Sequence, residues 1–122
     1  MRTLYPVFRY PDARAAIDWL CAAFGFAVHA VHDAPDGSVA HAQLALDEGM
    51  IMIGANSAPR PRPADDDWSV YVALDDVDAH CARARAAGAE IVREPFDTDY
   101  GSRDYAARDL AGNVWSFGTY RP

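Results

Sequence analysis

The four histidines, His29, His32, His41 and His80, are the residues of this sequence best suited to hold a metal or to carry protons near neutral pH. A metal site needs several donors that converge on one point. Only His29 and His32 are close in sequence, and alternation along a strand directs them to opposite faces. The histidines therefore show no spacing that is typical of a metal site.

His41 is the histidine best placed for acid–base chemistry, and Tyr105 could orient it or polarise a substrate oxygen. No carboxylate or nucleophile is placed beside His41 by the sequence, so the alternative is a half-exposed strand histidine with a water partner. Arg103 could receive a carboxylate or phosphate of a ligand through its planar guanidinium group. In the alternative interpretation, Arg103 pairs with Asp99 or Asp104 at the surface.

These residues belong to two halves of the chain that share one pattern when one half is shifted by about 63 to 64 positions. The first half predicts a strand over residues 3–9, a helix over 12–24 and strands over 26–33, 39–46 and 50–55. The second half predicts a strand over 68–74, a helix over 77–87 and strands over 90–96, 103–108 and 113–120. Each half therefore has the order β-α-β-β-β, which is an α+β arrangement.

Start and stop signals support both helices. Each has an aspartate before its first turn and a glycine after its last, namely Asp12 and Gly25 in the first half, and Asp75 or Asp76 and Gly88 in the second. Residues 57–67 are rich in Pro, Arg and Asp, and predict a linker that joins modules 1–56 and 68–122 within one domain. The linker is expected to be extended, either as a solvated connection or as a flap or arm.

Composition limits the classes of function. The 122 residues fit one domain, and the formal net charge of −7, with scattered basic residues, argues against a nucleic-acid partner. No apolar run is long enough to cross a membrane and no signal peptide is present, so we expect a cytoplasmic protein. Cys21 and Cys81 lie in the predicted helices and are interpreted as small buried apolar residues.

Two stretches carry a family resemblance. Residues 100–120, YGSRDYAARDLAGNVWSFGTY, resemble the closing hairpin of the metal-less, PhnB-like branch of the glyoxalase/bleomycin-resistance (vicinal oxygen chelate) superfamily. Residues 7–26, VFRYPDARAAIDWLCAAFGF, resemble the opening strand and helix of the same branch. The resemblance covers nearly the whole chain and implies tandem βαβββ modules that form a curved, cupped mixed sheet. The superfamily contains isomerases, dioxygenases, transferases and drug-sequestering proteins, so the fold does not specify the activity.

In the family's enzymes, each half supplies two metal ligands, one from its first strand and one from its last. Carried over to this sequence, these positions are Tyr5, Met52, Ser69 and Ser116, with Ile53 in place of Met52 if the register differs by one. A thioether and neutral hydroxyls are poor ligands for hard divalent cations. The resemblance therefore predicts no metal and no cofactor here, and classical glyoxalase I chemistry is disfavoured.

Side chains that share a face with these positions are expected to line a ligand cavity. The ligand-binding candidates are Tyr5, Gln43, Met52, Ser69, Tyr71, Arg103 and Ser116, with His41 and Tyr105 as catalytic candidates. A mixed apolar and polar lining suits a small molecule, so we expect a small-molecule binding protein and, from the resemblance, a homodimer. Two alternatives stay open: a metal-dependent lyase, isomerase or dioxygenase with ligands elsewhere, and a metal-independent enzyme that uses His41 and Tyr105.

Overall fold

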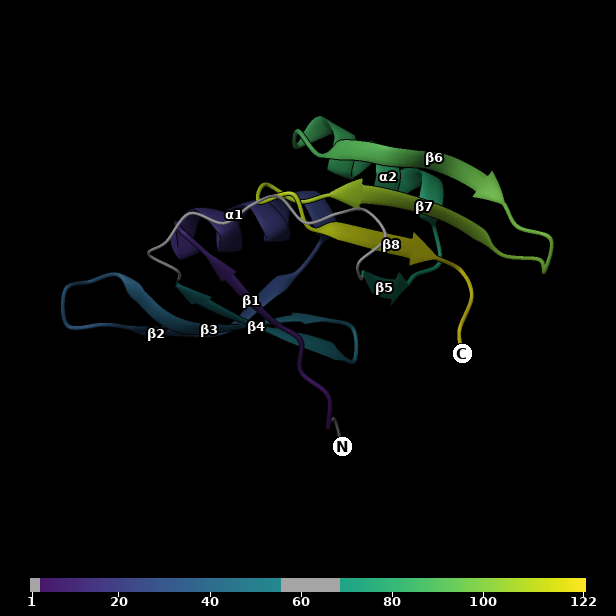
Figure 1. The fold of residues 1–122 in the computed structure, drawn as a ribbon. Helices are drawn as coiled ribbons and strands as arrows, with labels where there is room; N and C mark the ends of the chain where they lie inside the picture. Colours follow the sequence, from purple (N-terminus) through teal and green to yellow (C-terminus); the bar gives the residue numbers. More distant parts are fainter. Residues whose placement is uncertain (1–2, 56–68) are drawn as a thin grey trace. The chain divides into compact units, whose positions relative to one another are not determined.

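The computed structural model describes residues 3–55 and 69–122. The chain divides into two compact units, Met1–Arg60 and Pro61–Pro122, and the described residues of each unit form one helix and one four-stranded sheet (Figure 1). The predicted linker at 57–67 lies outside the described residues. Among the described helices, none has both the length and the apolar character that crossing a bilayer requires.

The first unit has the order β-α-β-β-β. Its elements are β1 (Val7–Tyr10), α1 (Ala13–Phe24), β2 (Ala27–Asp33), β3 (Val39–Leu46) and β4 (Gly49–Ala55). The strand order in the sheet is β1-β4-β3-β2, with β1 parallel to β4 and the other pairs antiparallel. The Asp12 side chain accepts a hydrogen bond from the amide of Ala15, and Gly25 ends α1 with a φ of 86°.

One face of this sheet packs against α1 and forms the core of the unit. Ile17, Leu20 and Phe24 on the helix are buried, as are Phe8 and Ile53 on the strands. Apolar residues at helical spacing and at alternate strand positions thus meet on this side of the sheet. Full burial of each such side chain stabilises the fold by about 1.5–3 kcal/mol relative to exposure. The helix therefore covers the strand face that carries these apolar residues.

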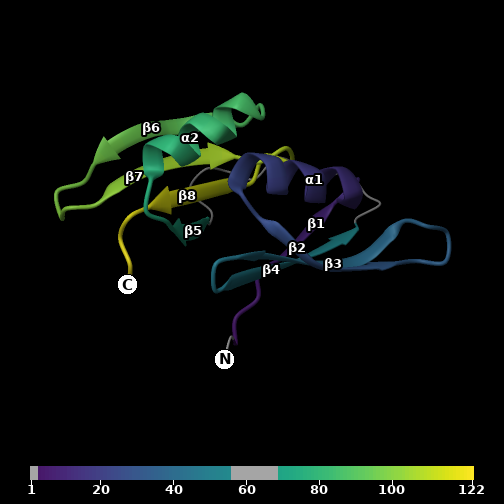
Figure 2. The same ribbon diagram turned by 180° about the vertical axis from the view of Figure 1, so that it is seen from behind.

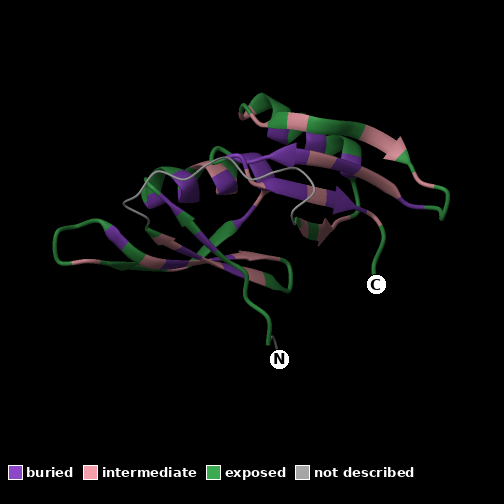
Figure 3. Ribbon diagram, viewed as in Figure 1, coloured by how far each residue is buried: buried purple, intermediate pink, exposed green. Residues whose placement is uncertain are grey.

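The second unit repeats the arrangement. Its elements are β5 (Val70–Ala73), α2 (Val77–Ala86), β6 (Glu90–Asp97), β7 (Arg103–Arg108) and β8 (Val114–Gly118), in the strand order β5-β8-β7-β6. The Asp76 side chain accepts from the amide of Ala79 at the start of α2. The helix contacts β6 and β7, and it lies along these strands when seen from behind (Figure 2). Strands β7 and β8 carry many of the buried residues (Figure 3).

The α+β class and the repeated βαβββ modules are confirmed, and the strand ends differ in places. The first strand was expected from residue 3 but begins at Val7, because Pro6 has no N–H to donate to a ladder. The last strand was expected to reach residue 120 but ends at Gly118, where its parallel partner β5 also ends at Ala73. Both differences concern the ends of strands and leave the order of elements unchanged.

Candidate functional site

Each sheet has a second face that its own helix does not cover, here called the helix-free face. In the first unit this face is set by the register, because cross-strand partners point to the same side. Its side chains come from Val7 and Arg9 in β1, Met50 and Met52 in β4, His41, Gln43 and Ala45 in β3, and Ala30 and His32 in β2, with Gly54 among them. This face carries most of the residues that the sequence proposed for the first half.

Met52 and Gln43 share this face, as predicted, and they are direct cross-strand partners. The alternative register with Ile53 is excluded, because Ile53 is fully buried on the face that packs against α1. Tyr5 lies before β1 and is partly exposed. The central position of the face is therefore occupied by a half-buried thioether beside a primary amide.

His41 has a histidine and an amide as neighbours. The rings of His41 and His32, on adjacent strands, have centroids 6.0 Å apart with an angle of 22° between planes. The Gln43 amide nitrogen lies 3.4 Å from Nε2 of His41. Among the described residues, no carboxylate is in contact with His41.

In the second unit, Ser116 lies at the centre of the helix-free face, between Tyr71 of β5 and Ala106 of β7. Ser69 precedes β5 and is exposed. The expectation that Arg103 and Tyr105 share this face is wrong, because the pairing assumed for β7 and β8 differs from the observed pairing by one residue. That expectation took residues 109–112 as the turn, whereas Arg108 pairs with Val114, so the connection is one residue longer and every side chain of β7 is assigned to the other face.

Tyr105 therefore lies beneath α2 and is 1% exposed. Its hydroxyl is 2.5 Å from Nδ1 of His80 on the helix, and its ring stacks on Phe117 with centroids 4.9 Å apart. Burial raises the pKa of Tyr105 well above its usual value, and nearby Cys81 adds to the effect. This hydroxyl connects the helix to the sheet and is not presented on the helix-free face.

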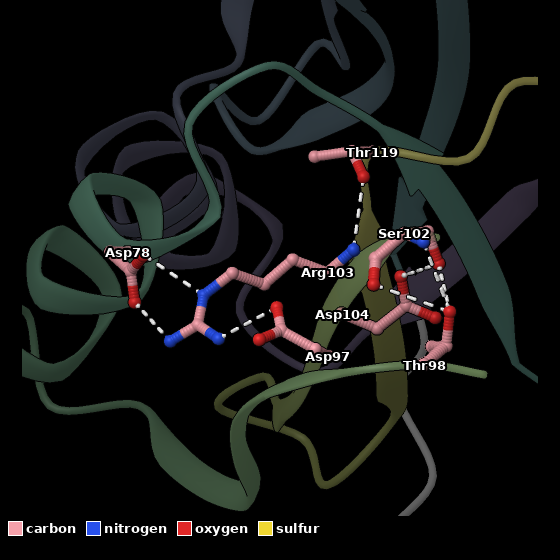
Figure 4. A network of polar contacts seen from close by, with 7 residues as sticks. All are labelled: Asp78, Asp97, Thr98, Ser102, Arg103, Asp104 and Thr119. Carbon is pink, nitrogen blue, oxygen red and sulfur yellow. Dashed lines mark hydrogen bonds and ion pairs between the residues drawn. The ribbon is translucent and has the colours of Figure 1, made fainter. Parts of the chain in front are cut away.

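Arg103 also lies on the helix side, where two carboxylates bind its guanidinium group (Figure 4). Nε and Nη2 each donate to Asp78 at 3.0 Å, and Nη1 donates to Asp97 at 3.1 Å. Hydrogen bonds from Arg103 lower the pKa of Asp78, and the pKa of Arg103 is raised in turn. Carboxylate pairing was one of the two expectations, but the partners are Asp78 and Asp97 and not Asp99 or Asp104.

Asp104 is the residue that the sequence reasoning missed on the second helix-free face. Its carboxylate accepts from the hydroxyl of Ser102 at 3.2 Å (Figure 4). A Cβ at Gly118 would collide with this carboxylate and with the Tyr71 hydroxyl, so both polar groups lie over the glycine. The Tyr71 hydroxyl donates to the carbonyl of Tyr120 at 2.8 Å, and burial followed by the charge of Asp104 raises its pKa. Strand alternation with the correct register would have found Asp104.

A divalent metal does not fit the side chains at the family's ligand positions. Tyr5, Met52, Ser69 and Ser116 provide a phenol, a thioether and two alcohols, which lack the basicity and charge that such a site needs. Within residues 3–55 and 69–122, no group of three or more His, Cys, Asp or Glu side chains is arranged to hold a metal ion. Both observations disagree with the metal chemistry of the family's enzymes.

Comparison with known proteins identifies the family. TioX of Micromonospora sp. ML1 is 32% identical, and its crystal structure matches with a TM-score of 0.80 over 99% of this chain and 98% of TioX. An uncharacterised protein of Mycobacterium bovis is 29% identical over 123 residues, which cover 94% of this chain and 81% of that protein. FosX, a fosfomycin resistance protein of Listeria monocytogenes, shares the fold at 15% identity, with a TM-score of 0.73 over 99% of this chain and 92% of FosX.

A family model also matches residues 3–117, almost the whole of the described chain. The chain belongs to the glyoxalase/bleomycin resistance protein/dioxygenase superfamily.

Proposed function

We propose that this protein binds a small molecule on the helix-free faces of its sheets, without a metal at the four positions that the family's enzymes use. The observation that carries the proposal is the exposure of apolar side chains on these faces: Val7 is 49% exposed and Tyr71 is 38% exposed. Half-buried Met52 lies beside Val7, with half-buried Gln43 next to it, and half-buried Ser116 lies beside Tyr71. Exposed apolar surface with a few directed polar groups is typical of a ligand site.

The metal-independent enzyme that pairs His41 with Tyr105 loses its geometric support. The Tyr105 hydroxyl is buried under α2 and bonded to His80, so it is not presented to a ligand on a helix-free face. The metal-dependent lyase, isomerase or dioxygenase gains no donor set from the described residues. The closing hairpin resembles that of the metal-less, PhnB-like branch. Binding without a metal-dependent reaction would agree with membership of that branch.

A ligand panel tests the proposal. Metabolites and drug-like compounds, including glycopeptide antibiotics, are screened for an increase in Tm, because a ligand at about 100 times its Kd adds about 2.7 kcal/mol to the free energy of unfolding. Gln43→Ala should lose the stabilisation by a compound that binds the first unit, whereas Asp18→Ala, on the exposed side of α1, should retain it. A panel in which no compound raises Tm would contradict the proposal.

We further propose that the protein is a homodimer, which is the assembly that the resemblance implies. Sedimentation equilibrium of the untagged chain at several concentrations measures the mass in solution. A monomeric mass at micromolar concentration would contradict this proposal and leave the binding proposal standing.

A further inference from the structure

A glycine leaves a gap among basic side chains on the helix-free face of the first unit. Gly54 lies between Arg9 of β1 and His41 of β3 in the register. A Cβ placed on Gly54 would lie 3.6 Å from Cγ of Arg9, so the aliphatic part of Arg9 leans over the glycine. The row continues to His32, which is the cross-strand partner of His41. Arg9, His41 and His32 therefore lie along one line across the sheet.

Arg9 differs from Arg103 in having no acidic partner among residues 3–55 and 69–122. The Arg103 guanidinium is held by Asp78 and Asp97, which neutralise its charge and occupy its donors. In the described part of the chain, Arg9 makes no ion pair and its side chain is exposed. A planar guanidinium with free donors is suited to receive a carboxylate or a phosphate.

The helix-free face of the first unit also lacks acidic side chains among its described strand residues. The carboxylate of β2, Asp33, lies on the other side, where Arg14 of α1 donates to it at 2.9 Å. This segregation is notable because the chain as a whole has a net charge of −7. The remaining polar group is the amide of Gln43, whose nitrogen lies 3.4 Å from Nε2 of His41 and keeps a second N–H that a ligand could accept from.

We propose that Arg9, His41 and the Gln43 amide bind the anionic group of a ligand, a carboxylate or a phosphate, over the gap at Gly54. The inference rests on the proposed small-molecule function and specifies the chemistry of the ligand. The guanidinium supplies two parallel N–H donors, and the amide and an imidazole N–H supply further donors from the opposite side. Met52 and Val7, the next residues on the same face, contact the apolar part of the ligand.

The test is a titration with inorganic phosphate and, separately, with acetate, followed by amide chemical shifts at constant ionic strength. We expect shifts centred on Arg9, Gly54 and His41, with a Kd in about the millimolar range for these fragments. Arg9→Gln should weaken binding about ten-fold or more, which corresponds to about 1.4 kcal/mol. Arg14→Gln removes the same charge from the other side of the unit and should leave the affinity within about two-fold.

A second variant guards against a folding defect in Arg9→Gln. Gly54→Val fills the gap, and the space around Gly54 accepts a Cβ at ordinary contact distance, so the unit should keep its fold. Its phosphate affinity should fall as in Arg9→Gln. Equal phosphate binding by the parent protein, Arg9→Gln and Gly54→Val would overturn the inference, as would shifts that sodium chloride reproduces. Comparison of phosphate with acetate decides which anion the site prefers.

This experiment separates the two proposals. If panel compounds that are neutral or cationic raise Tm equally in the parent protein and in Arg9→Gln, the binding function stands and the anion inference fails. If phosphate binds in an Arg9-dependent way while no panel compound raises Tm, the anion site stands and the small-molecule function, as tested, fails.

Discussion

At the scale of single residues, the Tyr105 hydroxyl lies where ionisation is unfavourable. Burial raises its pKa in the folded protein, whereas an unfolded tyrosine ionises near pH 10. Below about pH 10 the hydroxyl is neutral in both the folded and the unfolded protein, and its full contribution to the free energy of unfolding is present. This contribution is lost as the pH rises toward the folded pKa. The alkaline loss of stability should therefore begin near the pKa of an unfolded tyrosine.

Tyr105→Phe tests this by urea unfolding at pH 7 and at pH 10.5. The variant loses the hydrogen bond to His80 and should be less stable at pH 7 by about 1 kcal/mol, but it should lose less stability than the parent between the two pH values. Tyr100→Phe, at a residue that is 68% exposed, is the control and should follow the parent. An alkaline loss in Tyr105→Phe as large as that of the parent would show that this hydroxyl is not responsible.

The Arg103 contacts predict an effect at acidic pH. Arg103 lowers the pKa of Asp78, so the ion pair stabilises the fold above the unfolded carboxyl pKa of about 3.9 and is lost as the pH falls through the lower folded value. Arg103→Gln should lower Tm at pH 7, and the difference from the parent should shrink as the pH falls below about 4. Arg121→Gln removes a more exposed pair with Asp75 and should change Tm less. A difference that persists unchanged at pH 2 would contradict the assignment.

At the scale of elements, the turn between β7 and β8 is organised by one carboxylate. Buried Asp109 accepts from the backbone amides of Ala111 and Asn113, from the Asn113 side chain and from the indole of Trp115 at 3.1 Å. Its replacement leaves several donors without this acceptor, and one of them belongs to a fully buried tryptophan.

Asp109→Ala should therefore lower the free energy of unfolding by about 2–4 kcal/mol, measured by urea titration at pH 7. Asp99→Ala removes an exposed carboxylate from the preceding loop and should change stability by less than about 0.5 kcal/mol. Similar losses in the two variants would mean that Asp109 acts through its charge alone and not through the turn.

The same turn explains which parts of the structure could be predicted from the sequence. Apolar spacing and end signals such as Asp12 and Gly25 are local, so the order of elements and both helices were predictable. The register of β7 depends on how many residues Asp109 holds in the turn, and this network is not visible in a pattern of residue types. Because the expected turn was one residue shorter than the observed turn, Tyr105 was predicted to lie on the helix-free face, where Asp104 lies instead.

Partners distant in sequence were the other part that could not be predicted. Arg103 pairs with Asp78, 25 positions earlier in the chain, and the candidates offered by sequence proximity were different aspartates. On the first sheet the turn was expected at Glu48 and Gly49 but lies between Leu46 and Gly49, which shifts the pairing by two residues. A shift of two keeps every side chain on its face, so Gln43 shares the face of Met52 as expected. Local turn geometry thus decided whether each set of site residues was assigned to the right face.

At the scale of the whole molecule, the side chains at the four family positions predict that stability does not depend on a metal. Incubation of the untagged protein with a chelator should leave Tm within about 1 °C of the untreated value, because no structural metal is released. Elemental analysis of the same sample should find no stoichiometric Ni, Zn, Fe or Mn. A metal at one equivalent whose removal lowers Tm would contradict the proposed function and favour the metal-dependent alternative.

The two βαβββ units also differ in how their central hairpins close. In the first, Asp47 adopts a left-handed conformation with a φ of 50°, which costs a non-glycine residue about 1–2 kcal/mol, whereas Asp109 holds the corresponding turn of the second with side-chain hydrogen bonds. Local opening should therefore begin at the β3–β4 hairpin. In native-state hydrogen exchange, amides next to residues 47–48 should lose protection before those next to 109–113. Two halves of one topology would thus differ in the local stability of their equivalent hairpins.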